Sequence, residues 1–183
     1  MNENTTIRET PDSVCAKMVE MASISDFMSI LEPSAGNGKI ASYILEKYSF
    51  TELYFTLIEL NKEKCDYMKA NLNPDWEIVK GDFLNFQNTY SFDNKTFDRV
   101  IACPPFKGNI DVVHIEKMYS LLAKKGLMVT LTSPYWLTNN EPHQVHFREW
   151  LADKDYYMKV LPDNSFMEKG RSVPTAILKI FKK

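Results

Sequence analysis

The sequence of 183 residues contains no apolar run long enough to cross a bilayer. It also contains no secretory signal peptide and no lipidation motif. These absences disfavour a membrane-anchored or secreted protein, and we expect a cytoplasmic protein without membrane partners.

Cysteine is scarce, and the three that occur, Cys15, Cys65 and Cys103, are far apart and form no C-x-x-C pair. A disulfide scaffold and a zinc finger are both disfavoured, and we expect reduced thiols. His143 and His146 lie one helical turn apart. No third ligand accompanies them, so we predict no metal site.

The charge is nearly balanced, with 22 Lys and Arg against 24 Asp and Glu and a formal net charge of -2. No polybasic coat is present, so any surface that binds nucleic acid must be local. Internal repeats, low-complexity segments and Pro/Gly/Ser-rich linkers are also missing. With 44% hydrophobic residues, the chain is predicted to form a single domain, residues 1–183.

Short apolar runs alternate with helical patterns along the chain, which predicts a mostly parallel α/β sheet with helices on both faces. The two last runs are close in sequence, which predicts an antiparallel hairpin at one edge. Strands are expected at 25–34, 52–60, 76–82, 97–103, 127–133, 156–161 and 173–181. Helices are expected at 10–22, 40–48, 61–72, 112–126 and 143–152, with Thr10 as the cap of the first, Pro11 at its first position and Gly126 closing the fourth.

Ligands of open parallel sheets bind at the carboxyl ends of the strands, so the residues directly after each strand are informative. The first strand ends in a loop with Gly36 and Gly38, and the second ends at Glu59. The third is followed by Asp82 and Phe83. Taken singly, these are more often a tight turn, a carboxylate at a helix N-terminus, and a polar turn beside a core phenylalanine than parts of a binding site.

The fourth strand ends in "CPPF", residues 103–106. Prolines stop a strand and leave its backbone carbonyls without ladder partners. The conjunction of a glycine loop, an acidic residue, Asp-Phe and Pro-Pro-aromatic at four successive strand ends is far more specific than any one of them.

These motifs resemble those of class I S-adenosylmethionine-dependent methyltransferases, and in particular the small adenine-N6 DNA methyltransferases of phages and mobile elements. "EPSAGNGKI" is similar to their Glu/Asp-Pro-x-x-Gly-x-Gly loop, and "FDRVIACPPF" to their Asn/Asp/Ser-Pro-Pro-aromatic signature. "TPDSVCAKMVEMA" resembles the Thr-Pro helix before the cofactor loop, and the C-terminal region resembles their terminal hairpin. The resemblance covers roughly the whole chain and implies a Rossmann-like, seven-stranded fold.

The resemblance also implies which residues bind the cofactor, S-adenosyl-L-methionine. Glu59 is expected to bind the ribose hydroxyls, Leu60 to lie against the adenine ring, and Asp82 to meet the adenine amine with Phe83 nearby. Residues 1–24 are expected to cover the site. The implied set is Thr10, Pro11, Glu32, Pro33, Ser34, Ala35, Gly36, Asn37, Gly38, Glu59, Leu60, Asp82, Phe83 and Cys103.

The implied catalytic loop is Cys103, Pro104, Pro105 and Phe106. In the family, the first side chain and the carbonyl of the following proline accept hydrogens from the target amine, and the aromatic residue stacks on the target base. Cys103 departs from Asn, Asp or Ser, and a thiol is a weak acceptor. A slower enzyme, a shifted substrate and an inactive cofactor-binding relative all fit this change. A covalent role for the thiol is less attractive, because no activating partner is evident.

Further substrate contacts are expected around this loop. Tyr135 and Trp136 follow the fifth strand and are candidates for stacking on a base, although core packing fits them equally. Lys107, Arg148, Lys169 and Arg171 are candidates for phosphate contacts, although each also fits an ordinary solvated cation.

We therefore expect a methyltransferase that acts on an exocyclic amine, with adenine N6 of DNA as the preferred acceptor. An RNA base, a protein glutamine and a catalytically impaired module remain as alternatives, with a dinucleotide oxidoreductase as a distant one. No separate target-recognition domain is expected, so a specificity partner or a homodimer is plausible.

Overall fold

A seven-stranded, mostly parallel sheet forms the centre of the computed structural model, which describes residues 9–49, 52–88, 95–168 and 171–183. The strand order is β3-β2-β1-β4-β5-β9-β6, and only β9 runs antiparallel to its neighbours β5 and β6. These strands are β1 (Ser29–Glu32), β2 (Tyr54–Glu59), β3 (Glu77–Lys80), β4 (Phe97–Ala102), β5 (Leu122–Thr132), β6 (Asp155–Val160) and β9 (Ala176–Phe181). The predicted Rossmann-like sheet with its antiparallel C-terminal edge is confirmed.

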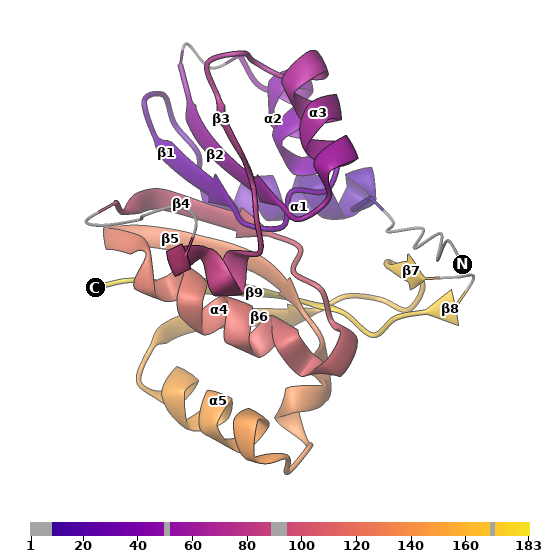
Figure 1. The fold of residues 1–183 in the computed structure, drawn as a ribbon. Coiled ribbons are helices and arrows are strands. Elements are labelled where there is room, and N and C mark those ends of the chain that lie inside the picture. Colours follow the sequence, from indigo (N-terminus) through magenta and orange to yellow (C-terminus); the bar gives the residue numbers. More distant parts are fainter. Residues whose placement is uncertain (1–8, 50–51, 89–94, 169–170) are drawn as a thin grey trace.

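Helices cover both faces of the sheet, as Figure 1 shows. One face carries α1 (Asp12–Ala22), α2 (Lys39–Lys47) and α3 (Lys62–Asn71), and the other carries α4 (Ile110–Ser120) and α5 (Pro142–Ala152). Each face has its own apolar core, because alternate strand residues point to opposite sides. Leu57 and Val129 pack on the α1 side, and Ile58 and Met128 on the α4 side.

Short elements connect the larger ones around one edge of this sheet. Three are short 3-10 segments, η1 (Phe83–Asn88), η2 (Lys107–Asn109) and η3 (Pro134–Leu137). The long connection from β6 to β9 contains a small hairpin, β7 (Met167–Glu168) and β8 (Arg171–Ser172).

Two boundaries differ from the sequence-based prediction. The fourth helix ends at Ser120 rather than at Gly126, because Leu122–Thr132 pairs along β4 as strand β5. Gly126 therefore lies inside β5, where an added Cβ would meet the Ala123 carbonyl oxygen at 2.8 Å. The first helix begins at Asp12 with Pro11 as its N-cap, so Thr10 is not the capping residue.

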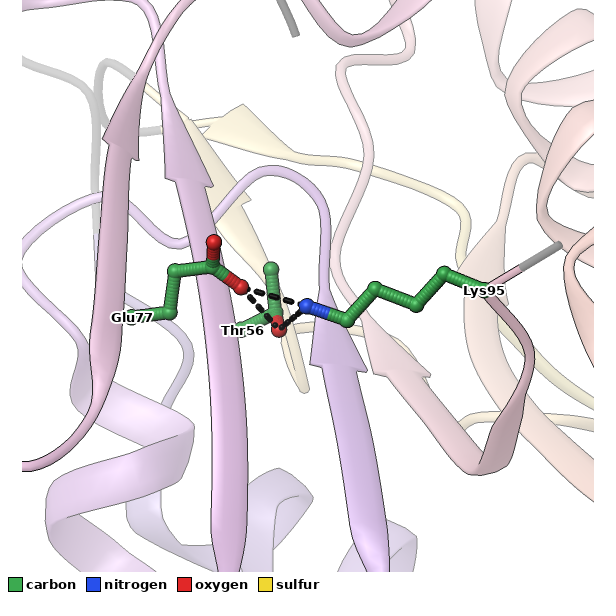
Figure 2. A network of polar contacts seen from close by, with 3 residues as sticks. All are labelled: Thr56, Glu77 and Lys95. Carbon is green, nitrogen blue, oxygen red and sulfur yellow. Dashed lines mark hydrogen bonds and ion pairs between the residues drawn. The ribbon is translucent and has the colours of Figure 1, made fainter. Parts of the chain in front are cut away.

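A polar network lies on β2 and β3, away from the carboxyl ends of these strands. Figure 2 shows the ammonium group of Lys95 pointing toward both Glu77 and Thr56. Lys95 Nζ is 2.5 Å from Glu77 Oε2 and 3.2 Å from Thr56 Oγ1, and the Thr56 hydroxyl donates to the same carboxylate. Because Lys95 directly precedes β4, this network fastens the start of that strand to the outer part of the sheet.

Within the described residues, no helix has the length and apolar character needed to span a membrane. The carboxyl ends of β1, β2, β3 and β4 meet at one edge of the sheet, because these strands are parallel neighbours. This edge therefore gathers the loops that the sequence singled out.

Candidate cofactor and acceptor site

The Glu59 carboxylate joins the ends of β1 and β2. Its Oε2 accepts a hydrogen bond from the Gly36 backbone N–H at 2.9 Å, and its Oε1 accepts one from the Asn61 N–H at 2.9 Å. The backbone adds a second link, since the Ala35 N–H donates to the Ile58 carbonyl at 2.9 Å. The glycine loop and Glu59 are thus held together as one unit.

Two glycines give this loop its shape, and they have different surroundings. Gly36 has φ +59° and Gly38 has φ +76°, both in the left-handed region that disfavours side chains. An added Cβ at Gly36 would meet nothing within 4 Å, whereas one at Gly38 would lie 2.7 Å from Leu72 Cδ1. Gly38 is therefore needed for packing against α3, and Gly36 faces open space.

Glu32, the last residue of β1, is an acidic group inside the protein, with 2% of its surface exposed. Its Oε2 has no hydrogen-bond partner among the described residues. Burial raises the pKa of this carboxyl well above its ordinary value, against a hydrogen bond from the Ala41 backbone, and the charge of Glu59 adds to the rise. A buried carboxylate without a counter-charge favours a cationic ligand beside it.

The end of β3 presents a carboxylate that is already partly used. Asp82 is exposed, and its Oδ1 accepts from the Leu84 N–H at 2.9 Å while its Oδ2 accepts from Asn85 Nδ2 at 2.7 Å. The carboxylate therefore shapes η1, and its remaining lone pairs are open to a further donor. Leu60, at the end of β2, is 67% exposed and offers an apolar surface at the same edge.

Phe83 lies in the core rather than on the surface of the site. It is 2% exposed and its ring lies 5.5 Å from that of His114, with the Lys117 ammonium 5.0 Å above it. Phe83 thus follows Asp82 directly in the chain, with its ring packed against α4, because an apolar ring is better buried than left exposed.

Residues Cys103 to Phe106, the implied catalytic loop, continue directly from β4 and are called the acceptor loop below. Pro104 is buried, Pro105 is exposed, and Cys103 and Phe106 are half-buried. Burial raises the pKa of the Cys103 thiol to about 12, against a hydrogen bond with the Thr10 side chain that lowers it, while the charge of Glu32 raises it further. The thiol is neutral at physiological pH, which argues against a covalent nucleophile at this position.

Thr10 holds the N-terminal segment on α1. It is 5% exposed, and its carbonyl accepts a hydrogen bond from the Cys15 thiol at 3.5 Å. Asn37 also reaches this segment, since its Nδ2 donates to Glu9 Oε1 at 3.1 Å. The segment before α1 is thus linked to the glycine loop through Glu9.

Phe166 is a residue of this site that the sequence reasoning missed. Its ring lies 5.9 Å from the Phe106 ring, tilted by 52°. It also lines a cavity of about 260 Å³ between the start of α1 and the segment that precedes the β7–β8 hairpin. The cavity is lined by Glu9, Pro11, Ser13, Asn164, Ser165, Phe166 and Met167. The available signal was an aromatic residue among the turn formers of "PDNSF".

Asp111 is a second residue that the sequence reasoning missed. It is 1% exposed, and its Oδ2 accepts from the Thr132 hydroxyl at 2.8 Å and from the Ser133 N–H at 2.9 Å. Burial raises the pKa of this carboxyl, and these hydrogen bonds oppose the rise. Asp111 therefore fixes the start of α4, directly after the acceptor loop, against the end of β5.

Some of the residues expected to contact the acceptor are exposed, and others are buried or already hydrogen-bonded within the protein. Tyr135 is 52% exposed, and Lys107 and Arg171 are also exposed. Lys169 lies outside the described residues. Trp136, by contrast, takes the core-packing alternative, because it is 3% exposed and its Nε1 donates to Thr132 Oγ1 at 3.1 Å.

The packing of η3 on α5 explains this difference. The Trp136 ring meets the Phe147 ring edge-on at 5.0 Å, so it belongs to the core. Arg148 is also occupied, since its Nη1 donates to the Trp136 carbonyl at 2.5 Å and to the Asn139 carbonyl at 2.6 Å. Its Nη1 therefore holds the η3 loop. His146 pairs with Glu116 at 3.6 Å.

No protein-family model matches the sequence. A putative methyltransferase of Methanocaldococcus jannaschii is 28% identical over 99 residues, which cover 52% of this chain and 37% of that protein. The (S)-tetrahydroprotoberberine N-methyltransferase of Eschscholzia californica is 24% identical over 159 residues, covering 85% of this chain and 42% of that enzyme. The chain thus spans about two-fifths of the length of these relatives.

Solved structures share the fold at low sequence identity. The methyltransferase subunit of a type I restriction-modification system from Streptococcus thermophilus superposes with a TM-score of 0.82 at 17% identity, covering 96% of this chain and 45% of that one. A putative class I S-adenosylmethionine-dependent methyltransferase from Listeria monocytogenes gives 0.73 at 14% identity, covering 94% and 60%. The fold is that of class I methyltransferases, and the relatives support a methyltransferase.

Proposed function

We propose that the chain binds S-adenosylmethionine and transfers its methyl group to an exocyclic amine, with adenine N6 in DNA as the preferred acceptor. The main support for this proposal is that two loops lie next to each other at one edge of the sheet. The glycine loop with buried Glu32 ends β1, and Cys103 to Phe106 ends its neighbour β4. The side chain of Thr10, in the N-terminal segment before α1, lies close enough to Cys103 to lower the pKa of its thiol.

The cofactor's chemistry fits the residues at the ends of β1, β2 and β3. Its ammonium and sulfonium groups are cations, and Glu32 offers a buried carboxylate whose Oε2 lacks a partner among the described residues. Gly36 borders open space, Glu59 can accept from ribose hydroxyls, and exposed Leu60 offers a surface for a purine. When bound, the cofactor supplies a methyl group on sulfonium, which an acceptor nitrogen takes with loss of one proton.

The acceptor loop supplies position rather than acid-base chemistry. The Pro104 carbonyl can accept one hydrogen of the target amine, and the Phe106 ring can stack on the planar acceptor. Cys103 with a pKa of about 12 stays a neutral thiol and is a weak second acceptor. We therefore place the acceptor amine against Pro104, with Phe106 and Phe166 on either side of the acceptor plane.

A stacked base needs about 7 Å between two parallel rings, so the 5.9 Å pair of Phe106 and Phe166 has to open slightly to admit one. Exposed Tyr135, Lys107 and Arg171 lie on connections at this sheet edge and are proposed as further contacts to the acceptor and its phosphates. The similarity to a restriction-modification methyltransferase subunit supports DNA as the acceptor. The similarity to an N-methyltransferase supports a nitrogen acceptor more generally.

Two measurements test this proposal. Isothermal titration calorimetry should detect S-adenosylmethionine binding, and loss of binding in Glu59→Ala is expected because that side chain joins the loop to β2. An absence of binding by the wild-type chain would refute the methyltransferase proposal. Transfer of tritiated methyl groups to DNA, RNA and protein pools then identifies the acceptor.

Phe106→Ala should lower kcat/KM by roughly 5- to 160-fold while leaving cofactor affinity unchanged, because base stacking contributes about 1–3 kcal/mol. Tyr67→Ala on α3, which also removes a half-exposed aromatic ring, is the matched control and should have no effect. Transfer only to RNA or protein would replace the DNA assignment. Cofactor binding without transfer to any pool would favour an impaired module.

A further inference from the structure

The outer edge of β6 is an unpaired sheet edge. In the sheet order, β6 is the terminal strand and pairs only with β9 among the described strands. Its residues are exposed on both faces, apart from half-buried Met158. Tyr156 is 45% exposed, Tyr157 55% and Val160 53%, which is unusual apolar exposure for a free edge strand.

The backbone groups that face outward can be assigned from one hydrogen bond. The Leu161 N–H donates to the Thr175 carbonyl at 2.9 Å, in the same register that pairs Lys159 with Ile177 and Tyr157 with Lys179. Because N–H and C=O directions alternate along an antiparallel strand, Tyr157 and Lys159 face β9. Tyr156 and Met158 therefore direct their backbone N–H and C=O groups to the open edge.

The sequence of this edge is complementary to itself. In an antiparallel pair of two β6 strands, the outward groups form hydrogen bonds when Tyr156 of one copy lies opposite Met158 of the other. This register places Tyr157 opposite Tyr157 of the other copy at the two-fold axis. It also places Asp155 opposite Lys159 twice, in non-hydrogen-bonded pairs where side chains come closest.

Other registers that satisfy the outward groups lose this complementarity. A shift by two residues in either direction separates both Asp155–Lys159 pairs, and a shift by four in one direction places Asp155 opposite Asp155 of the other copy. We propose that β6 is a self-association surface, through which two copies of this chain pair antiparallel across a two-fold axis. The paired strands join the two sheets into one continuous sheet.

The geometry also determines what this dimer does to the methyl-transfer site. Strand β6 is parallel to β5, because both run antiparallel to β9. The two-fold axis reverses strand direction, so the carboxyl ends of the two sheets lie on opposite edges of the joined sheet. The two sites therefore stay separate and each is built from one chain, so that dimerisation leaves the activity per chain unchanged.

Sedimentation equilibrium and light scattering test the proposal on the 183-residue chain. The mass of the wild type should rise with concentration from 21.2 kDa toward twice that value. Asp155→Lys and Lys159→Asp should each weaken association on the order of tenfold or more, because each replaces two attractive pairs by two repulsive ones. The double variant Asp155→Lys/Lys159→Asp should restore it. Exchanging the exposed Lys62–Asp66 pair on α3 is the charge-matched control.

Hydrogen exchange distinguishes this interface from any other. The Tyr156 and Met158 amides should become protected as concentration rises, whereas the Tyr157 amide, which faces β9, should be protected at every concentration. A wild-type chain that stays monomeric up to about 1 mM would overturn the proposal. So would a dimer whose Tyr156 and Met158 amides exchange freely, or one that the double variant fails to restore.

Discussion

The two glycines of the loop after β1 allow packing and ligand binding to be separated by one matched pair of substitutions. Gly36→Ala and Gly38→Ala add the same methyl group at nearby positions with φ +59° and φ +76°. Both changes force an L side chain into the left-handed region, which costs roughly 1–2 kcal/mol. The two variants therefore share their backbone cost and differ only in what the new methyl group meets.

The size of the difference follows from the neighbouring atoms. At Gly38 the new Cβ would lie 2.7 Å from Leu72 Cδ1 and 3.2 Å from Met68 Sδ, so both side chains must move. Because these atoms are the far ends of flexible side chains, the overpacking falls at the low end of its usual range, about 1 kcal/mol. At Gly36 no atom lies within 4 Å. We expect Gly36→Ala to lose roughly 1–2 kcal/mol of unfolding free energy and Gly38→Ala roughly 2–3 kcal/mol.

Thermal unfolding measures the effect of each substitution on packing, and calorimetric titration with S-adenosylmethionine measures its effect on cofactor binding. For a domain of this size, 1 kcal/mol shifts Tm by roughly 2–4 °C, so the two variants should be separated by several degrees. Gly36→Ala is expected to be the more stable of the two variants. It should nevertheless bind the cofactor at least about tenfold more weakly than the wild type does, because its methyl group occupies the open space beside Glu59. Wild-type affinity in Gly36→Ala would refute the assignment of that space to the cofactor, and equal Tm values would refute the packing argument.

Three further outcomes follow from single side chains. Cys103→Asn should raise kcat for an amine acceptor by roughly 10- to 1,000-fold in the methyl-transfer assay, because it restores a strong hydrogen-bond acceptor; a fall would indicate a dedicated role for the thiol. Lys95→Met should lower unfolding free energy by about 0.5–1 kcal/mol in urea titrations, with the difference shrinking at high salt if the half-exposed Glu77 contact is ionic. Burial lowers the pKa of His114 from 6.5 to about 4, so the unfolded chain takes up a proton that the folded protein does not, and stability falls as pH falls through that window. In His114→Phe, this pH-dependent loss of unfolding free energy should be smaller by on the order of 3 kcal/mol. Its Tm should therefore change less between pH 6.5 and 4 than the Tm of the wild type does.

The strand-end residues of the site could be predicted because they depend on local sequence and one topological rule. Parallel neighbours bring their carboxyl ends to a common edge, so Gly36, Glu59, Asp82 and Cys103 gather there once the alternation of strands and helices is recognised. Their internal hydrogen bonds could not be predicted. Nothing in the sequence indicates that Glu59 holds the Gly36 N–H or that Asp82 is occupied by η1.

The contributions of distant segments were beyond the sequence patterns. Phe166 reaches Phe106 through the long connection between β6 and β9, and no periodicity specifies where such a connection lies. Trp136 and Tyr135 are neighbours in sequence, yet one is buried and the other exposed, because only the first meets α5. The end of α4 was misplaced for a similar reason. Leu121 and Leu122 extend the helical pattern, but pairing of β5 with β4 takes precedence.

Cys103 is the residue of the acceptor loop that fits the proposed methyl transfer least well, because a thiol is a weak hydrogen-bond acceptor. Its position predicts which kinetic constant is lowered. Most of the proposed cofactor residues lie at the ends of β1, β2 and β3, whereas the thiol lies at the end of β4 and holds its proton. A poor acceptor at this position leaves the Pro104 carbonyl as the main hydrogen-bond partner of the target amine. The missing hydrogen bond matters at the step in which the nitrogen lone pair is aligned with the methyl group. The loss should therefore fall on kcat, with cofactor affinity and the proposed stacking of the acceptor on Phe106 preserved. An impaired binding module and a slow enzyme then differ only in turnover, and a low but saturable rate with undiminished cofactor binding would identify the enzyme.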